Sequence, residues 1–215
     1  MLHKNSTMKI KVYPIEKTNV SLERVLTLIK LAFQERKEQG LNYGCLSLSL
    51  DGFQEEVKDS MILIAMDEDS DVLCGCSVLM IRCDKDGNRF GWEKHTSVHP
   101  EYKGKGVGSL LINSLKAKAI ELDCEYLGCS TAVDAESAIR VHLKNGYYIV
   151  GLKSFRSTNY YSYMFRMQLT PSCWSDPLYC KKQYKKSRRK IRVAYKADGS
   201  KTILGRLLAN IGVNW

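Results

Sequence analysis

The sequence predicts an α/β protein, in which helices flank a mixed β-sheet and a basic extension follows at the C-terminus. Three observations support this fold class. Apolar residues after Gly106 recur at the 3.6-residue spacing of a helix, three extended segments directly precede that helix, and three more follow it with one helix between them. Extended and helical segments that alternate in this way are typical of a sheet covered by helices.

The N-terminal elements are a short strand, an amphipathic helix and a short acidic helix. Residues 9–15 alternate weakly between polar and apolar side chains, which indicates a strand. Ser21 is a suitable N-cap, and the helix that follows has an apolar stripe made of Leu22, Val25, Leu26, Ile29, Ala32 and Phe33. A second, acidic helix is expected over residues 53–59.

Three strands then form an antiparallel meander. Residues 61–66 are an apolar run that ends in an acidic turn, and residues 72–83 resume the extended pattern. Turn-forming residues at 84–88 reverse the chain, and residues 90–98 form the returning strand.

The helix after Gly106 is the most regular of the chain, with an apolar stripe made of Val107, Leu110, Leu111, Leu115, Ala119 and Leu122. Residues 126–133 are apolar enough for a buried strand. A helix capped by Asp134 is expected to run to Asn145, and Gly146 suits the left-handed residue that ends it. Residues 148–154 and 161–169 complete the order β-α-α-β-β-β-α-β-α-β-β.

Composition places the chain among soluble cytoplasmic proteins. It has 215 residues, of which 44% are hydrophobic and 26% charged, enough for one domain with an appendage. No apolar run reaches about 18 residues and no secretory leader is evident, so we expect neither a membrane span nor export. Eight cysteines without a C-x-x-C pair are expected to be reduced and mostly buried, with no bound metal.

The charge is concentrated at one end of the chain. The net charge is +10, and residues 171–215 contain 11 Lys and Arg against 2 Asp and Glu. We therefore divide the chain into a main α/β domain over residues 1–170 and a basic C-terminal extension over residues 171–215.

The turn between the third meander strand and the regular helix is rich in glycine and lysine. It reads Lys103-Gly104-Lys105-Gly106-Val107-Gly108. Glycines let a backbone approach an anion closely, and free amides at a helix N-terminus favour a phosphate. The alternative is an ordinary glycine-rich turn with solvated lysines. Neither the dinucleotide fingerprint nor the Walker A spacing is present.

This turn resembles motif A of the GNAT acetyltransferase superfamily, Q/R-x-x-G-x-G/A, and residues 98–102 resemble its lead-in. The order of elements over residues 9–169 is also similar to that family's. Ala138 and the segment Lys144-Asn145-Gly146-Tyr147 resemble its second signature. The resemblance implies an acetyltransferase fold in which acetyl-CoA is the acyl donor.

The resemblance also implies where acetyl-CoA binds. Its pantetheine arm would pair with the backbone around Thr96 to Val98, in a splay between two parallel strands. Its pyrophosphate would rest on the amides of Lys103, Gly104, Lys105, Gly106, Val107 and Gly108.

Candidate catalytic residues follow from the chemistry of amine acylation. An amine with a pKa of about 10.4 is almost fully protonated at pH 7, so a base helps. The resemblance makes Glu93 our first candidate for that base, because its strand faces the acceptor in the family and a carboxylate there often acts through water. Its alternative is a solvated carboxylate paired with Lys94 or Arg89. His95 shares the side of Glu93 unless a bulge reverses the strand.

The second signature departs from the family, with Ala135 in place of Asn and His142 in place of the Tyr that serves as general acid. His142 either protonates the leaving sulfur or is a packing residue. A CoA thiol has a pKa near 8.5, so an acid is helpful rather than obligatory. We expect Cys129 to be a core residue, because the family transfers the acyl group directly.

The acceptor is a primary amine of unidentified class. Glu35 and Tyr43 lie where the family places its acceptor-recognition elements, and we predict that both contact the substrate. A polyamine, antibiotic, amino sugar or protein amine all remain open.

The basic run at residues 181–192 favours either a nucleic-acid or ribosome tether, or a solvated loop or strand packed on the domain. An apolar helical stripe follows, made of Ile203, Leu204, Leu207, Leu208 and Ile211. We expect the stripe to dock on the domain or on a second subunit rather than on a membrane, which leaves a homodimer open. Two alternative functions are a binding module that works through the tail and a different nucleotide-binding enzyme.

Overall fold

The computed structural model of the chain describes residues 9–155, 158–196 and 201–210. Its strands are β1 (Ile10–Pro14), β2 (Ser60–Asp67), β3 (Val72–Cys83), β4 (Arg89–Val98), β5 (Tyr126–Ala132), β6 (Tyr148–Ser154) and β7 (Tyr161–Gln168). Its helices are α1 (Leu22–Glu38), α2 (Leu50–Val57), α3 (Val107–Glu121), α4 (Glu136–Lys144), α5 (Pro177–Ala194) and α6 (Ile203–Asn210). Short 3₁₀ turns occur at Ile15–Lys17, Gly44–Leu46, Pro100–Tyr102 and Cys173–Ser175.

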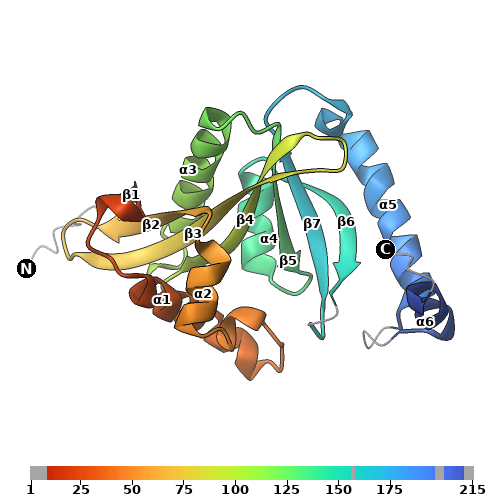
Figure 1. The fold of residues 1–215 in the computed structure, drawn as a ribbon, viewed down its shortest axis with the longest axis horizontal. Helices are drawn as coiled ribbons and strands as arrows, with labels where there is room; N and C mark the ends of the chain where they lie inside the picture. The colour runs from red at the N-terminus through yellow and green to blue at the C-terminus, as the bar shows by residue number, and fades with distance from the viewer. Residues whose placement is uncertain (1–8, 156–157, 197–200, 211–215) are drawn as a thin grey trace, which may run out of the picture.

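A single seven-stranded mixed sheet forms the centre of the described structure, in the order β1-β2-β3-β4-β5-β7-β6 (Figure 1). Strands β1 to β4 form an antiparallel meander, and β4 pairs with β5 in parallel. Strand β7 then inserts between β5 and β6 and is antiparallel to both. The predicted fold class and the predicted order of elements up to β7 are confirmed.

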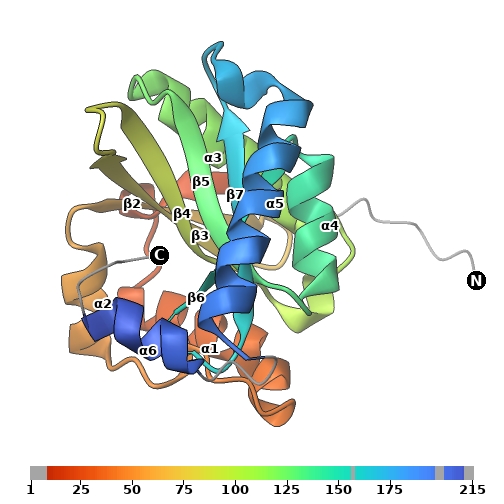
Figure 2. The same cartoon turned by 90° about the vertical axis from the view of Figure 1, so that its right-hand side faces the viewer.

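Helices cover both faces of the sheet, and the core divides accordingly. On one face, Leu111 and Leu115 of α3 pack with side chains from β2, β3, β5 and β7. On the other face, Ile29 of α1 and Phe53 of α2 pack against a second set from β2 and β3. Figures 1 and 2 show α1 and α2 on the opposite side of β3 and β4 from α3. A side chain of β4 therefore points either toward α1 and α2 or toward the face covered by α3.

Local capping is partly as predicted. The Ser21 side chain accepts a hydrogen bond from the Arg24 amide at 3.3 Å and caps α1. The cap of α4 is Ala135 rather than Asp134, and no side chain caps that helix, because α4 begins one residue later than expected. Gly146 has a φ of +93°, the left-handed conformation expected after α4.

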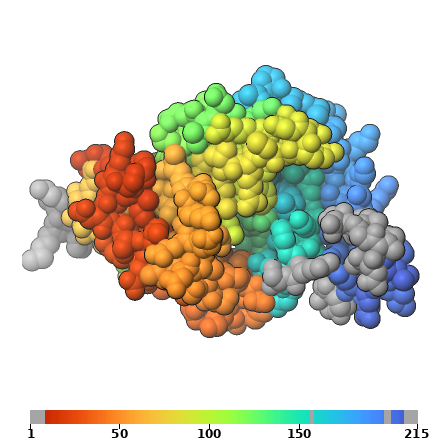
Figure 3. All heavy atoms as spheres, viewed as in Figure 1, coloured from red at the N-terminus to blue at the C-terminus, as the bar shows by residue number. Residues whose placement is uncertain are grey.

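The basic run is a helix, which corrects the expectation of a loop or strand. Helix α5 lies along β6, where a Cβ added to Gly151 would stand 3.1 Å from the Ser187 hydroxyl oxygen. Cys180, Ile191 and Ala194 are buried on its inner side. In the space-filling view the tail helices, in blue, lie at the opposite end of the molecule from the N-terminal segment, in red (Figure 3). Within the described residues, no helix combines the length and the apolar character needed to cross a bilayer.

Candidate active site

The glycine-rich turn between β4 and α3 has the geometry of an anion cradle. Gly104 and Gly106 have φ values of +78° and +87°, a left-handed conformation that favours glycine. A Cβ added at either position would meet no protein atom within 4 Å, so the space above both residues is open. Gly106 is also the N-cap of α3 and supplies no side-chain cap.

The amides of this turn fall into two groups. Those of Lys103 and Lys105 donate to the carbonyls of Pro100 and Tyr102, each at 3.3 Å, and so stabilise the turn itself. In the described part of the chain, no protein acceptor meets the amides of Gly104 and of residues 106–108. The first amides of an α-helix have no intrahelical partner and lie at the positive end of its dipole. The turn therefore offers four free amide donors to an anion. The resemblance had implied that all six amides from Lys103 to Gly108 would bind the pyrophosphate.

Strands β4 and β5 separate beside this turn. They pair only over Phe90–Tyr126, Gly91–Leu127 and Trp92–Gly128, after which β5 pairs with β7 alone. Residues 93–98 of β4 are thus free of a partner strand on that side among the described strands. This is the splay that the resemblance implied, and Thr96 and Val98 lie on it. Glu93 and Cys129 are the first residues beyond the last pair.

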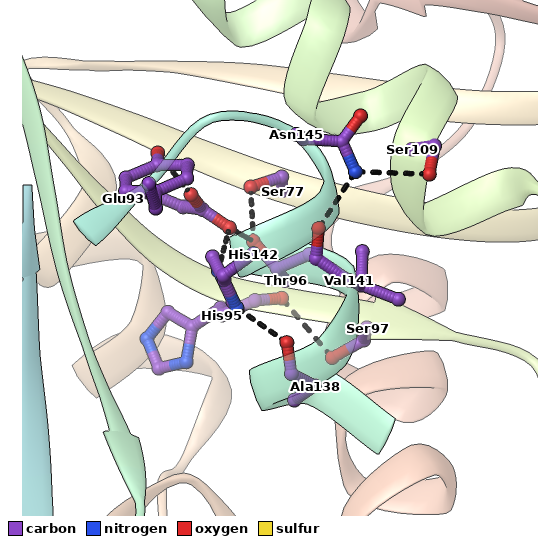
Figure 4. A network of polar contacts seen from close by, with 11 residues as sticks. Ser77, Glu93, His95, Thr96, Ser97, Ser109, Ala138, Val141, His142 and Asn145 are labelled. Atoms are coloured by element: carbon purple, nitrogen blue, oxygen red, sulfur yellow. Dashed lines mark hydrogen bonds and ion pairs between the residues drawn. The ribbon is translucent and has the colours of Figure 1, made fainter. Parts of the chain in front are cut away.

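Glu93 lies in the centre of a buried polar cluster at the point of separation (Figure 4). Its Oε1 accepts hydrogen bonds from Thr96 Oγ1 at 2.5 Å and is 3.1 Å from His142 Nε2. Its Oε2 accepts one from the Tyr147 hydroxyl at 2.6 Å. Glu93 is only 4% exposed, so it is not the solvated carboxylate paired with Lys94 or Arg89 that was the alternative. Lys94 pairs with Glu56 instead.

The hydrogen bonds of His142 define its protonation state. Its Nδ1 is 2.8 Å from the carbonyl oxygen of Ala138, which can only accept, so Nδ1 carries a proton. Its Nε2 faces a carboxylate that already accepts from Thr96 and Tyr147. Both ring nitrogens therefore donate, and the geometry is that of an imidazolium–carboxylate pair.

The electrostatics agree with this assignment. Burial opposes the charge of Glu93. The charge of His142 and the hydrogen bonds from His142, Thr96 and Tyr147 nevertheless lower the pKa of Glu93. Burial likewise opposes the charge of His142, but Cys129 and Glu93 raise its pKa. Since burial raises the pKa of Cys129 to about 11, that thiol is neutral at pH 7. Glu93 is therefore the anion that holds the second proton on His142.

A bulge in β4 separates His95 from Glu93. The register between β3 and β4 shifts between Cys76 and Val78, and His95 has a φ of +56°. Its Nε2 is 2.7 Å from Glu56 Oε1, and its ring packs edge-on to Phe53, both on α2. His95 therefore faces α2 and points away from the Glu93 cluster (Figure 4).

Two members of the cluster were not among the catalytic candidates. Tyr147, at 1% exposed, supplies a hydrogen bond to Glu93, although the sequence singled it out only as part of the second signature. Thr96 was expected to present its backbone, and its hydroxyl also links Glu93 to Ser77 at 2.6 Å. Tyr147 lies 54 residues from Glu93 in the chain, too far for any local pattern to pair them.

The two predicted acceptor residues have different surroundings. Glu35 on α1 forms an ion pair with Lys103 Nζ at 2.9 Å, which lowers the pKa of the carboxyl group and joins α1 to the glycine-rich turn. Tyr43 stacks on Tyr160 with ring centroids 4.7 Å apart, so the loop after α1 meets the loop before β7. Asn159 strengthens this contact, because its amide donates to the Gly40 carbonyl at 2.8 Å. Burial raises the pKa of Tyr43 to about 12, so its hydroxyl is a neutral donor.

The potential ligand atoms of Glu93, Cys129 and His142 all lie within 4.8 Å of one another. However, Nε2 of His142 is hydrogen-bonded to the Glu93 carboxylate, and Nδ1 is hydrogen-bonded to the carbonyl oxygen of Ala138. A metal ion bound to Nε2 of His142 and to Glu93 would have to displace the charged hydrogen bond between these two side chains. We therefore interpret the cluster as an ion pair rather than as a metal centre.

Several solved structures share this fold. The NatC complex bound to Gag peptide and CoA has a chain that is 16% identical, with a TM-score of 0.59 over 76% of this chain and 100% of that one. NAA60 from Arabidopsis thaliana in complex with a bisubstrate analogue is 18% identical, with a TM-score of 0.57 over 75% and 100%. YncA from Salmonella typhimurium, with its cofactor acetyl-CoA, is 14% identical, with a TM-score of 0.57 over 77% and 96%.

Among curated proteins, none matches the sequence of this chain. The sequence profile of the acetyltransferase (GNAT) family matches residues 25–147, which is more than half of the chain. That range includes the cradle, the splay, and all of Glu93, His142 and Tyr147. The chain therefore belongs to the acetyltransferase (GNAT) family, a family of acyl-CoA-dependent N-acyltransferases.

Proposed function

We propose that this enzyme transfers an acetyl or other short acyl group from acyl-CoA to a primary amine, by direct attack within a ternary complex. The observation that carries the proposal is the cradle of four unpartnered amides at the start of α3, which lies beside the splay of β4 and β5. The cradle suits a pyrophosphate, and the splay leads from the cradle to the Glu93–His142 pair. Bound acetyl-CoA or CoA in the structures of similar fold supports the choice of donor.

The reaction breaks the C–S bond of the thioester and forms a C–N bond, and the electron pair leaves on sulfur. We propose that His142 donates its Nε2 proton to that sulfur, since it stands at the motif position of the family's acid. Glu93 and Tyr147 then act as positioning residues that keep the imidazole protonated and oriented. A thiol of pKa near 8.5 leaves readily, so this acid assists the reaction without being indispensable.

Glu93 remains a candidate for accepting the amine proton through water, as the sequence suggested. Three donors already bind its carboxylate, and it is 4% exposed, so the geometry favours the role of holding His142. In that case the amine loses its proton to solvent, and activity rises with pH as the fraction of free amine grows. For the acceptor we propose contact with Tyr43, where the two loops meet, and with Glu35 only if its pair with Lys103 opens.

A matched pair of glycine substitutions tests the cradle. Gly106→Ala places a methyl group in the open space above the turn and strains a left-handed residue. Gly87→Ala, in the β3–β4 hairpin, has a similar φ of +83° and equally open surroundings. Both should destabilise the fold by about 1–2 kcal/mol per left-handed residue. Only Gly106→Ala should weaken acyl-CoA binding.

The readout is thermal unfolding with acetyl-CoA, longer acyl-CoAs, NAD and ATP. Acetyl-CoA at about 100 times its dissociation constant should stabilise the wild type by about 2.7 kcal/mol, and Gly87→Ala equally. Gly106→Ala should lose most of that gain. If no acyl-CoA stabilises the wild type while NAD or ATP does, the proposed donor is wrong. Thiol release with a panel of polyamines, amino sugars, antibiotics and peptides then identifies the acceptor class.

A further inference from the structure

The outer face of α5 is a dense cation cluster. The helix contains eight Lys and Arg residues and no Asp or Glu. Lys185, Arg188, Arg189 and Arg192 recur at helical spacing and together line one surface hollow. Among the described residues, no carboxylate forms an ion pair with any of these four. We call them the α5 cation cluster.

Helix α6 is fixed against the end of α5. The Thr202 amide donates to the Ala194 carbonyl at 2.9 Å, and a β-bridge joins Tyr195 to Lys201. A Cβ on Gly205 would stand 2.0 Å from the Ala194 carbonyl oxygen, so only glycine allows this contact. Figure 2 shows both helices on the side of the molecule that faces the viewer.

This contact leaves the apolar side of α6 exposed. Ile203 is 80% exposed, Leu204 47% and Leu207 57%, and we call these three the α6 apolar patch. The sequence predicted that this stripe would dock on the domain or a second subunit. The described members do not dock on the domain; the side chain of Leu208 and all of Ile211 lie outside the described residues. An exposed apolar patch on a helix that is joined to the end of a cation-rich helix points to a partner that can contact both.

We propose that α5 and α6 bind the surface of an anionic lipid membrane. The α5 cation cluster would meet the headgroup phosphates, and the α6 apolar patch would enter the boundary with the acyl chains. A nucleic acid, one of the alternatives that the sequence left open for the basic run, would neutralise the cations but would leave three large apolar side chains in water. The exposed α6 apolar patch is the observation that favours lipid over nucleic acid, and this proposal differs from the sequence-based expectation of no membrane partner.

Vesicle sedimentation of the full chain tests the proposal. The wild type should sediment with vesicles of phosphatidylcholine mixed with phosphatidylglycerol and not with phosphatidylcholine alone. Replacing the four residues of the α5 cation cluster with Gln should abolish binding. The control is a set of four exposed cations elsewhere, Lys17→Gln, Arg24→Gln, Lys85→Gln and Lys116→Gln, which changes the net charge equally. This control should still bind the anionic vesicles.

A second variant isolates the apolar contribution. When the three residues of the α6 apolar patch are replaced with Gln, the protein should still bind anionic vesicles weakly at low salt. At high salt, where charge attraction is screened, this variant should not bind them, whereas the wild type should retain some binding. Unchanged stabilisation by acetyl-CoA would confirm that both variants remain folded.

Three results would overturn the proposal. One is an equal loss of vesicle binding in the control set. Another is a patch variant that binds vesicles like the wild type at every salt concentration, while RNA or DNA binds more tightly than vesicles. The last is light scattering that shows a wild-type dimer, converted to monomer by the patch variant, because a second copy would then cover α6.

Discussion

Replacing Glu93 with Gln removes a buried charge while it keeps the size and one carbonyl oxygen of the side chain. In the wild type, Glu93 is 4% exposed and His142 is 6% exposed, and Oε1 of Glu93 lies 3.1 Å from Nε2 of His142. Removing one partner of a buried ion pair leaves the other charge uncompensated and costs about 3–5 kcal/mol. We expect Glu93→Gln to lower the free energy of unfolding by that amount at pH 6.

The pH dependence of this loss gives a sharper test. In the wild type the pKa of His142 is raised above its unfolded value of about 6.5, so its contribution to stability is complete below that pH. It is then lost as pH rises toward the folded pKa, at up to about 1.4 kcal/mol per pH unit. The lowered pKa of Glu93 adds a second loss as pH falls below its unfolded value of about 4.3.

In Glu93→Gln the sign reverses, because burial without the anion lowers the pKa of His142. The variant should gain stability as pH rises to about 6.5 and then become flat. Urea unfolding from pH 6 to pH 9 measures both slopes. Glu121→Gln, which removes an exposed partner of Lys118, is the control and should follow the wild type within about 0.5 kcal/mol. Parallel curves for the wild type and Glu93→Gln would refute the ion pair.

Three further substitutions test the surroundings of the site. Tyr147→Phe removes one hydrogen bond to a charged, buried acceptor and should lower the free energy of unfolding by about 1.5–3 kcal/mol in urea titrations; an unchanged midpoint would contradict the 2.6 Å contact. Cys129→Ala should keep most of the acyl-transfer rate and the wild type should show no acyl adduct by intact mass, whereas an adduct lost in Cys129→Ala would overturn direct transfer. Tyr43→Ala should raise the KM for the amine without changing that for acetyl-CoA, and the opposite pattern would remove Tyr43 from the acceptor site.

Much of the fold could be predicted because its signals are local. The meander strands, the glycine-rich turn and α3 each show their period and their turn residues within a few positions of the sequence. The splay of β4 and β5 was implied only by the resemblance to the GNAT family, and the left-handed conformation of Gly104 and Gly106 was not predicted. The side that His95 faces could not be predicted from the sequence, because one extra residue in a strand reverses every side chain beyond it, and a bulge leaves no reliable mark on the sequence.

Long-range contacts explain the other differences. The Glu93 cluster joins residues 49 and 54 positions apart, so no spacing rule links His142 and Tyr147 to the same carboxylate. For residues 181–192 we expected a loop or a strand, because like charges along a helix repel one another and the segment has few apolar residues that could be buried. Lys and Arg are nonetheless good helix formers, and α5 buries Cys180, Ile191 and Ala194.

In the proposed complex, the amides at the start of α3 bind the pyrophosphate of CoA. Backbone amide NMR of the ¹⁵N-labelled enzyme, titrated with CoA, measures this directly. We expect the amides of Gly104, Gly106, Val107 and Gly108 to show the largest shift changes, and those of Gly87 and α5 to stay unchanged. Saturable CoA binding that leaves these four amides unmoved would contradict this proposal.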